Sequence, residues 1–110
     1  MNSPKLPEVS ALSLERTAEL FGVLSTPVRL QIIRALCDGE KNVTHLLAQI
    51  EASQPNMSRH LQVLYQSGVL TKRRSGHQIF YSLAEASRAL VCRLVCLQLA
   101  RDEQVFEVPV

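Results

Sequence analysis

Three cysteines, Cys37, Cys92 and Cys96, carry the most reactive side chains in the sequence. Cys92 and Cys96 lie four residues apart in a segment with helical periodicity, so their sulfur atoms share one face and could bind one soft ion together. Sulfane sulfur or an oxidant can also link paired thiols. The structural alternative is core packing, because free cysteine is often a small buried apolar residue. The residues themselves leave both interpretations open.

Polar and basic side chains line one side of a predicted helix that follows Ser53. Ser53 is a typical N-cap, Met57, Leu61 and Leu64 form one apolar stripe, and Gly68 marks the end of the helix. The opposite side carries no acidic residue, so its side chains can donate hydrogen bonds to base edges or phosphates. The candidate DNA-reading residues are Ser53, Gln54, Asn56, Ser58, Arg59 and Gln62.

A hairpin with a cationic tip follows this reading helix. Residues 69–73 and 78–83 are predicted strands, and residues 74–77 form a turn that contains Gly76. Such a tip can reach the phosphates or the minor groove beside a helix that lies in the major groove. A polar helix or a basic tip alone would usually be only a solvated surface, so the DNA-binding interpretation depends on their order. The candidate contacts in the hairpin are Lys72, Arg73, Arg74, Ser75, His77 and Gln78.

Two helices are predicted before residue 40. Ser13 is the expected cap of the first, and Thr26 with Pro27 begins the second as N-cap and first helical residue. The second helix covers about residues 28–37, and it is expected to bury one stripe of Leu30, Ile33 and Cys37 and, beside it, Val28, Ile32 and Leu36.

A short third helix over residues 45–50, capped by Thr44, leads through a turn at residues 51–52 into the reading helix. The two helices and their turn complete a helix-turn-helix.

The last predicted helix covers about residues 84–102 and is apolar on two sides. One side can pack on its own domain. The other has no partner in a chain of this length, so we expect it to pair with a second copy, together with the first helix. The candidate dimer contacts are Leu14, Phe21, Leu90, Leu94, Val95 and Leu97.

The composition fits one domain of 110 residues, and a core of this size is more stable when a partner covers part of its surface. We expect a flexible arm at residues 1–12, a domain at 13–103 and a tail at 104–110. A net charge of +2 is too small to identify a nucleic-acid binder. An odd number of cysteines without a signal peptide or a membrane span indicates a reducing cytoplasm.

The sequence resembles the ArsR/SmtB family of dimeric winged helix-turn-helix repressors over about residues 14–101. The resemblance rests on LSTPVRLQIIRAL, on SQPNMSRHLQVLYQSGVL and on the strand that ends in IFYSL. It implies a mainly α fold with a small β-hairpin wing (α+β), in the order α-α-α-α-β-β-α. It also implies a homodimer that binds an operator palindrome in double-stranded DNA until an inducer releases it.

The metal sites of that family are missing from this sequence. Where arsenite- and heavy-metal-sensing members have Cys-Val-Cys, this chain has Asn42, Val43 and Thr44. The positions that match the zinc ligands of the last helix hold Glu85, Ser87, Gln98 and Arg101. We therefore expect no zinc site and no other certain cofactor.

The cysteines remain as the candidate sensor, because in this fold the helix that ends at Cys37 packs near the last helix. If all three converge, they offer thiolates for arsenite or antimonite. If Cys37 meets only one of the others, the pair suits sulfane sulfur or an oxidant, and Cys37 with Cys96 is the pair to test first.

Other classes of function remain as alternatives. One is a repressor whose cysteines are purely structural, and another is a winged-helix module that binds proteins. An enzyme is not expected, because we find no nucleophile with a base, no phosphate loop and no paired carboxylates. A thiol oxidoreductase would need a Cys-x-x-Cys pair at a helix start, and this spacing is absent.

Overall fold

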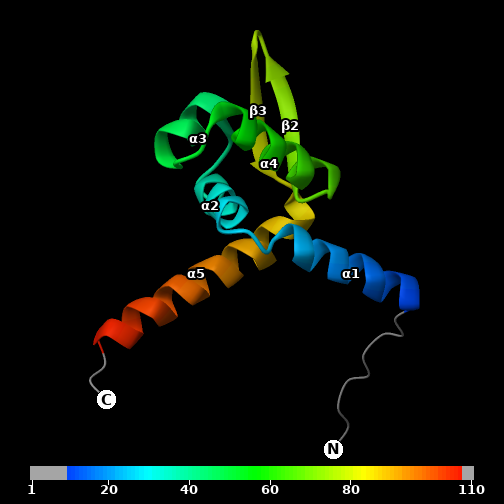
Figure 1. Cartoon of the computed structure of the whole chain (residues 1–110), viewed down its shortest axis with the longest axis vertical. Coiled ribbons are helices and arrows are strands. Elements are labelled where there is room, and N and C mark those ends of the chain that lie inside the picture. Colours follow the sequence, from blue (N-terminus) through cyan, green and yellow to red (C-terminus); the bar gives the residue numbers. More distant parts are fainter. Residues whose placement is uncertain (1–9, 108–110) are drawn as a thin grey trace, which may run out of the picture.

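The structure is a computed structural model and describes residues 10–107. Helices dominate it, and a small sheet projects from one end (Figure 1). The elements, in chain order, are α1 (Ala11–Val23), α2 (Pro27–Leu36), β1 (Lys41–Asn42), α3 (Val43–Gln49), α4 (Gln54–Gln66), β2 (Leu70–Ser75), β3 (Gln78–Leu83) and α5 (Glu85–Glu107). This is the predicted mainly α winged helix-turn-helix, with the short strand β1 added.

The elements from α2 to β3 pack together, and we call this part the head. Its core is formed where α2, α3 and α4 pack over the base of the sheet. The predicted stripe of the reading helix is confirmed, since Met57, Leu61 and Leu64 are fully buried. The prediction for Leu30 was wrong, because this side chain is 38% exposed. The predicted burial of Ile32, Ile33 and Leu36 is confirmed, since all three are fully buried.

The sheet is antiparallel in the order β1-β3-β2, so β3 lies in the middle. The hairpin turn is shorter than predicted: Ser75 pairs with Gln78, and Gly76 and His77 alone connect the strands. Gly76 has a φ of 63°, which suits the first central position of a two-residue turn that matches the twist of the strands. Arg74 and Ser75 therefore belong to β2 rather than to the tip.

Two predicted helix caps were wrong by a few residues. Ser10 rather than Ser13 caps α1, and its side chain accepts a hydrogen bond from the backbone N–H of Ser13. Asn42 rather than Thr44 caps α3, because the chain leaves β1 in an extended conformation at Asn42. In both cases the hydroxyl residue was the expected cap, but the backbone had already become helical before it. Thr26 and Ser53 stand at the predicted N-cap positions, although only the Ser53 side chain accepts a capping hydrogen bond.

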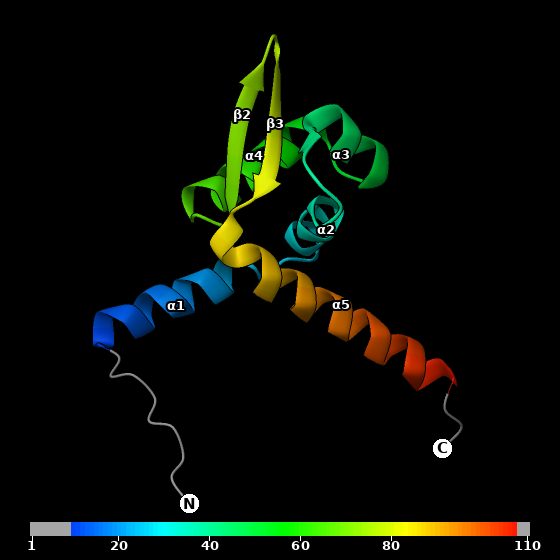
Figure 2. The same ribbon diagram turned by 180° about the vertical axis from the view of Figure 1, so that it is seen from behind.

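Helices α1 and α5 diverge from the head in both ribbon views (Figures 1 and 2). No residue of α1 is buried, and Leu14 and Phe21 are 59% and 65% exposed. On α5, Leu94 and Leu97 are 52% and 59% exposed. This helix continues to Glu107, past the predicted end of the domain at residue 103. The side chains of Leu90 and Val95 lie outside the described ones, as do residues 1–9 and 108–110 of the predicted arm and tail.

The burial pattern of α2 predicts unequal effects of the same truncation at two of its leucines. Leu36→Ala should lower the free energy of unfolding by about 2–5 kcal/mol, because it leaves a cavity in the core. Leu30→Ala, on the exposed side, should cost less than about 1 kcal/mol. Urea unfolding of both variants at one protein concentration measures the difference. Equal losses would contradict this assignment of the core.

Candidate nucleic-acid interface and thiol pair

Helix α4 presents a polar face to solvent along its whole length. Its Ser53 cap accepts a hydrogen bond from the backbone N–H of Asn56 at 3.2 Å, which satisfies part of the helix N-terminus. Because the apolar stripe is buried in the head, the opposite side must face outward. The structure leaves every candidate reading residue exposed: Ser53, Gln54, Asn56, Ser58, Arg59 and Gln62.

Arg59, the cation of this face, is oriented by a hydrogen bond within α4 itself. The Arg59 guanidinium donates to Oδ1 of Asn56, one turn earlier, at 2.5 Å. The charge therefore lies along the first half of α4, where backbone N–H groups also favour an anion. This arrangement can donate hydrogen bonds to a phosphate or to the acceptors of a base edge.

The cations of the hairpin divide between its two faces. Residues that pair across antiparallel strands share a face, so Lys72 lies on the side of its partner Tyr81 and Arg74 on the same side. The Lys72 ammonium stands 4.3 Å from the ring centroid of Tyr65 on α4. Arg73 points to the opposite side. Lys72 and Arg74 thus lie on the face that turns toward the reading helix.

Arg73 is held by a carboxylate that the sequence analysis did not identify. Its Nε donates to Oε2 of Glu40 at 2.8 Å, a second bond joins Nη2 to Oε1, and the guanidinium lies 4.8 Å from the centroid of Phe80. The hydrogen bond and the charge of Arg73 lower the pKa of Glu40. Among the described residues this is the single ion pair, so none of their acidic side chains pairs with Arg74.

The outer half of β3 is fastened to the start of α3 through Asn42, which is buried. Its Nδ2 donates to Oε1 of Gln78 at 3.1 Å, while its Oδ1 accepts from the backbone N–H of His45 at 2.8 Å. Gln78 was predicted to contact DNA, and the structure places its amide oxygen in this internal bond. Neither Glu40 nor Asn42 had a signal in the sequence, since β1 had not been expected.

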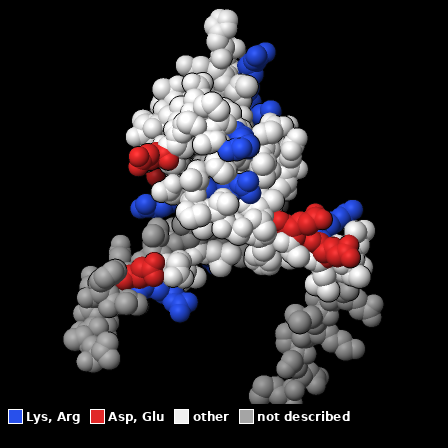
Figure 3. All heavy atoms as spheres, viewed as in Figure 1, with Lys and Arg blue, Asp and Glu red and all other residues white. Residues whose placement is uncertain are grey.

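Basic side chains gather on the front of the head, along the hairpin and over α4 (Figure 3). On this face, acidic side chains lie at the edge of the head and on the two helices below it. In this view the head therefore carries mainly basic side chains along the hairpin and α4, while the two helices below it carry both signs of charge.

Cys37 and Cys92 form a disulfide that joins the C-cap of α2 to α5. Their Cα atoms are 6.0 Å apart, and both side chains are half-buried against the core. Cys96 is free and exposed. The structure thus pairs Cys37 with Cys92 rather than with Cys96, which lies one turn further along α5.

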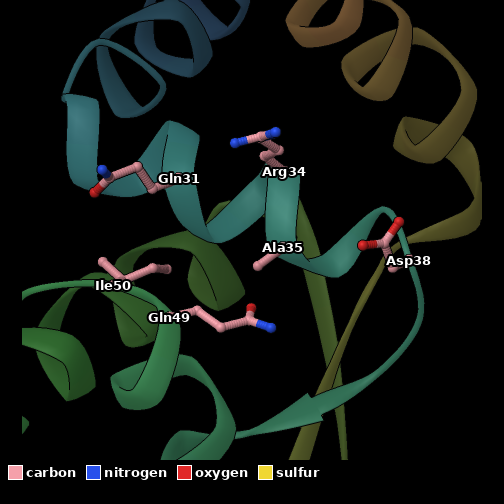
Figure 4. Close-up of a pocket in the computed structure, with 6 residues that line it drawn as sticks. All are labelled: Gln31, Arg34, Ala35, Asp38, Gln49 and Ile50. Atoms are coloured by element: carbon pink, nitrogen blue, oxygen red, sulfur yellow. The ribbon is translucent and has the colours of Figure 1, made fainter.

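A polar pocket of about 260 Å³ opens between α2 and α3 (Figure 4). In the close-up, Arg34 points away from Gln49, and Asp38 lies at the far end of the pocket. The polar groups do not converge on one point, as a small-molecule site requires. The residues that line the pocket are Gln31, Arg34, Ala35, Asp38, Gln49 and Ile50.

Within residues 10–107, no group of three or more histidine, cysteine or acidic side chains is arranged to hold a metal ion. The same part of the chain contains no helix with the length and apolar character needed to cross a bilayer.

Residues 26–72, from the start of α2 into the hairpin, match the model of a family described as bacterial regulatory protein, arsR family. A biofilm growth-associated repressor of Xylella fastidiosa is 43% identical over 79% of this chain and 77% of its own length.

Two solved structures extend the comparison to the fold. The transcriptional repressor BigR from Xylella fastidiosa aligns with a TM-score of 0.71 and 40% identity, over 80% of this chain and 88% of the other. A homodimeric winged helix-turn-helix DNA-binding domain from Mycobacterium bovis, a possible ArsR-family regulator, aligns with a TM-score of 0.72 and 29% identity, over 91% of each chain. The chain therefore belongs to the ArsR family and is a winged helix-turn-helix transcriptional repressor rather than an enzyme.

Proposed function

We propose that this chain binds a palindromic operator in double-stranded DNA as a homodimer, and that a thiol-reactive inducer acting on Cys37 and Cys92 releases it. The observation that carries the proposal is the position of this cysteine pair, which links the C-cap of α2 to α5. We propose the cytoplasm as its place of action, where DNA is present and free thiols persist.

In this proposal α4 lies in the major groove and its exposed polar side chains read base edges. Arg59 contacts a base or a phosphate near the helix N-terminus. Arg74 and the tip at His77 reach the neighbouring phosphates or the minor groove, since both are exposed and Arg74 has no acidic partner among residues 10–107. Arg73 contributes less, because a phosphate must first compete with Glu40 for its guanidinium.

The second copy is proposed to cover the exposed leucines of α5 and the apolar side of α1. A chain this small does not keep several large apolar side chains in water without a functional reason. Two reading helices related by a two-fold axis would then meet half-sites about one helical turn, or a multiple of it, apart. The homodimeric relative from Mycobacterium bovis supports this arrangement.

The switch is a two-electron reaction of the cysteine pair. With a polysulfide, one thiolate attacks the terminal sulfur, the S–S bond of the polysulfide breaks, the shortened polysulfide leaves and the cysteine becomes a persulfide. The second thiolate then attacks the cysteine sulfur of that persulfide and expels hydrosulfide. The two thiols lose two electrons and two protons, and the sulfane sulfur is reduced. With peroxide, the first step gives a sulfenic acid and water, and the second gives the disulfide and another water.

Arsenite or antimonite is the second candidate inducer. Each As–S or Sb–S bond would form with loss of water and without change of oxidation state, and Cys96 could supply a third thiolate. The exposure of Cys96 and the disulfide between the other two cysteines favour the sulfur or oxidant chemistry.

The DNA proposal predicts different effects for three arginines. Arg59→Ala should lower affinity for the specific operator, by about 1–3 kcal/mol if it contacts a base. Arg74→Ala should weaken all DNA binding and reduce the salt slope by about one phosphate contact. Arg73→Ala should change the slope less than Arg74→Ala. Fluorescence anisotropy with the upstream DNA of its own gene, over a salt series, measures both quantities.

Arg16→Ala on α1 is the control for that series, since it removes an exposed cation far along the chain from α4 and the hairpin. A wild-type protein that retards no upstream fragment at low salt with reduced thiols would refute the repressor proposal.

The dimer proposal predicts that Leu94→Glu yields monomers, because it would bury an unpaired charge in the interface. Leu94→Met keeps an apolar side chain of similar volume and should remain dimeric. Analytical ultracentrifugation at micromolar concentration distinguishes the two states. A wild-type monomer under these conditions would exclude the dimer.

The switch predicts that Cys37→Ser and Cys92→Ser bind the operator yet no longer respond to polysulfide or peroxide, since a serine oxygen cannot form the bridge. The wild-type protein should lose about 1–3 kcal/mol of operator affinity when linked, the range of most allosteric couplings. Cys96→Ser should still respond. Release of the Cys37→Ser, Cys92→Ser double variant by the same reagents would return these cysteines to a structural role.

A further inference from the structure

Arg29 of α2 joins three helices through two hydrogen bonds. Its Nη1 donates to the backbone carbonyl oxygen of Val23, the last residue of α1, at 3.0 Å. Its Nε donates to Nδ1 of His60, in the middle of the reading helix α4, at 3.2 Å. Both bonds are partly buried, and the one between Arg29 and His60 joins α2 to α4 across 31 positions of sequence.

The geometry of the guanidinium makes this contact directional. Its N–H groups lie in one rigid plane, so the two acceptors fix the orientation of the side chain, which a lysine ammonium would not achieve. A carbonyl at the end of α1 also accepts a cation favourably, because helix carbonyls there lack partners. The position of His60 is thus set against the corner between α1 and α2.

We propose that Arg29 is a positioning residue for DNA recognition: it sets the angle of α4 against α1 and α2, and it requires His60 to be neutral. This inference rests on the proposed function. Helix α2 holds Arg29 in its first turn and ends at its C-cap, Cys37, so one rigid element connects the thiol pair to the reading helix.

The proton state of His60 decides whether the contact exists. Nδ1 can accept from Arg29 only when the imidazole is neutral, with its proton on Nε2, since both nitrogens of an imidazolium are donors. Burial, and then the charges of Arg29 on α2 and Arg59 on α4 itself, lower the pKa of His60 below its usual 6.5. The group of α1 that takes part in this contact is the backbone carbonyl of Val23, which carries no charge.

The lowered pKa of His60 determines how the Arg29–His60 contact depends on pH. The contact is complete at neutral pH and above, and it is lost as the pH falls below 6.5 and through the lowered pKa of His60. Acidification should therefore weaken operator binding through this residue. A histidine that touched phosphate directly would show the opposite trend, because its protonation would add a favourable charge.

The first test is made on the free, reduced protein. Long-range ¹H–¹⁵N spectra of the histidine rings report the tautomer and the titration of each imidazole. We expect His60 to carry its proton on Nε2 and to titrate below its usual value of 6.5, and Arg29→Gln to abolish this tautomer preference. An Nδ1-protonated His60, or an unchanged spectrum in Arg29→Gln, would overturn the inference whatever the protein does with DNA.

The second test compares operator affinity at neutral pH and at about pH 5. Arg29→Gln should lose about tenfold at neutral pH, the size expected for a hydrogen bond to a charged group. His60→Gln keeps an oxygen acceptor for Arg29 without a titrating group, so it should bind like the wild type at neutral pH and lose less on acidification. His45→Gln, on α3, is the matched control and should follow the wild type.

The outcomes separate the two proposals. If His60→Gln weakens as steeply in acid as the wild type, or if Arg29→Gln binds normally, Arg29 has no positioning role. If the wild type binds no upstream DNA, the repressor proposal fails and this role with it, even where the spectra show the Arg29–His60 contact. Arg29→Lys, which keeps the charge but not the planar fork, should recover only part of the affinity.

Discussion

The packing of α2 into the head is the constraint on which the other features depend. Ile32, Ile33 and Leu36 are completely buried, and this helix contacts α3, α4, α5 and β3. Burial of each such side chain contributes roughly 1.5–3 kcal/mol, so these three fix the position of α2 more firmly than any polar contact could. Arg29 near its beginning and Cys37 at its end are placed by that packing.

The same core decides which residues are free to act. Because the stripe of α4 is buried, its polar side faces solvent as one continuous surface. The middle and outer half of the short sheet are fastened by the bond of Asn42 to Gln78 and by the pair of Arg73 with Glu40, so the hairpin projects as a stiff element. Ion pairs this exposed contribute little to stability. Their effect here is to select which cations remain available to a partner.

Features determined by neighbouring residues could be predicted from the sequence, and those determined by packing could not. The Ser53 cap and the stripe of α4 depend on spacing alone and are confirmed. The caps at Ser10 and Asn42, the strand β1 and the partner of Cys37 depend on how the chain enters each element and where α5 leaves the head. The pairs of Arg73 with Glu40 and of Arg29 with His60 join residues more than thirty positions apart.

Helix α1 has 13 residues and none of them is buried. An isolated helix of this length is close to the limit of stability in water, since it must offset the cost of nucleation with few hydrogen bonds. In the proposed dimer a second copy covers α1, so the order of this helix depends on association, and association depends on how much protein is present. In a dimer of this design the amount of folded α1 rises with the concentration of the chain, so the abundance of the protein itself becomes an input to its activity.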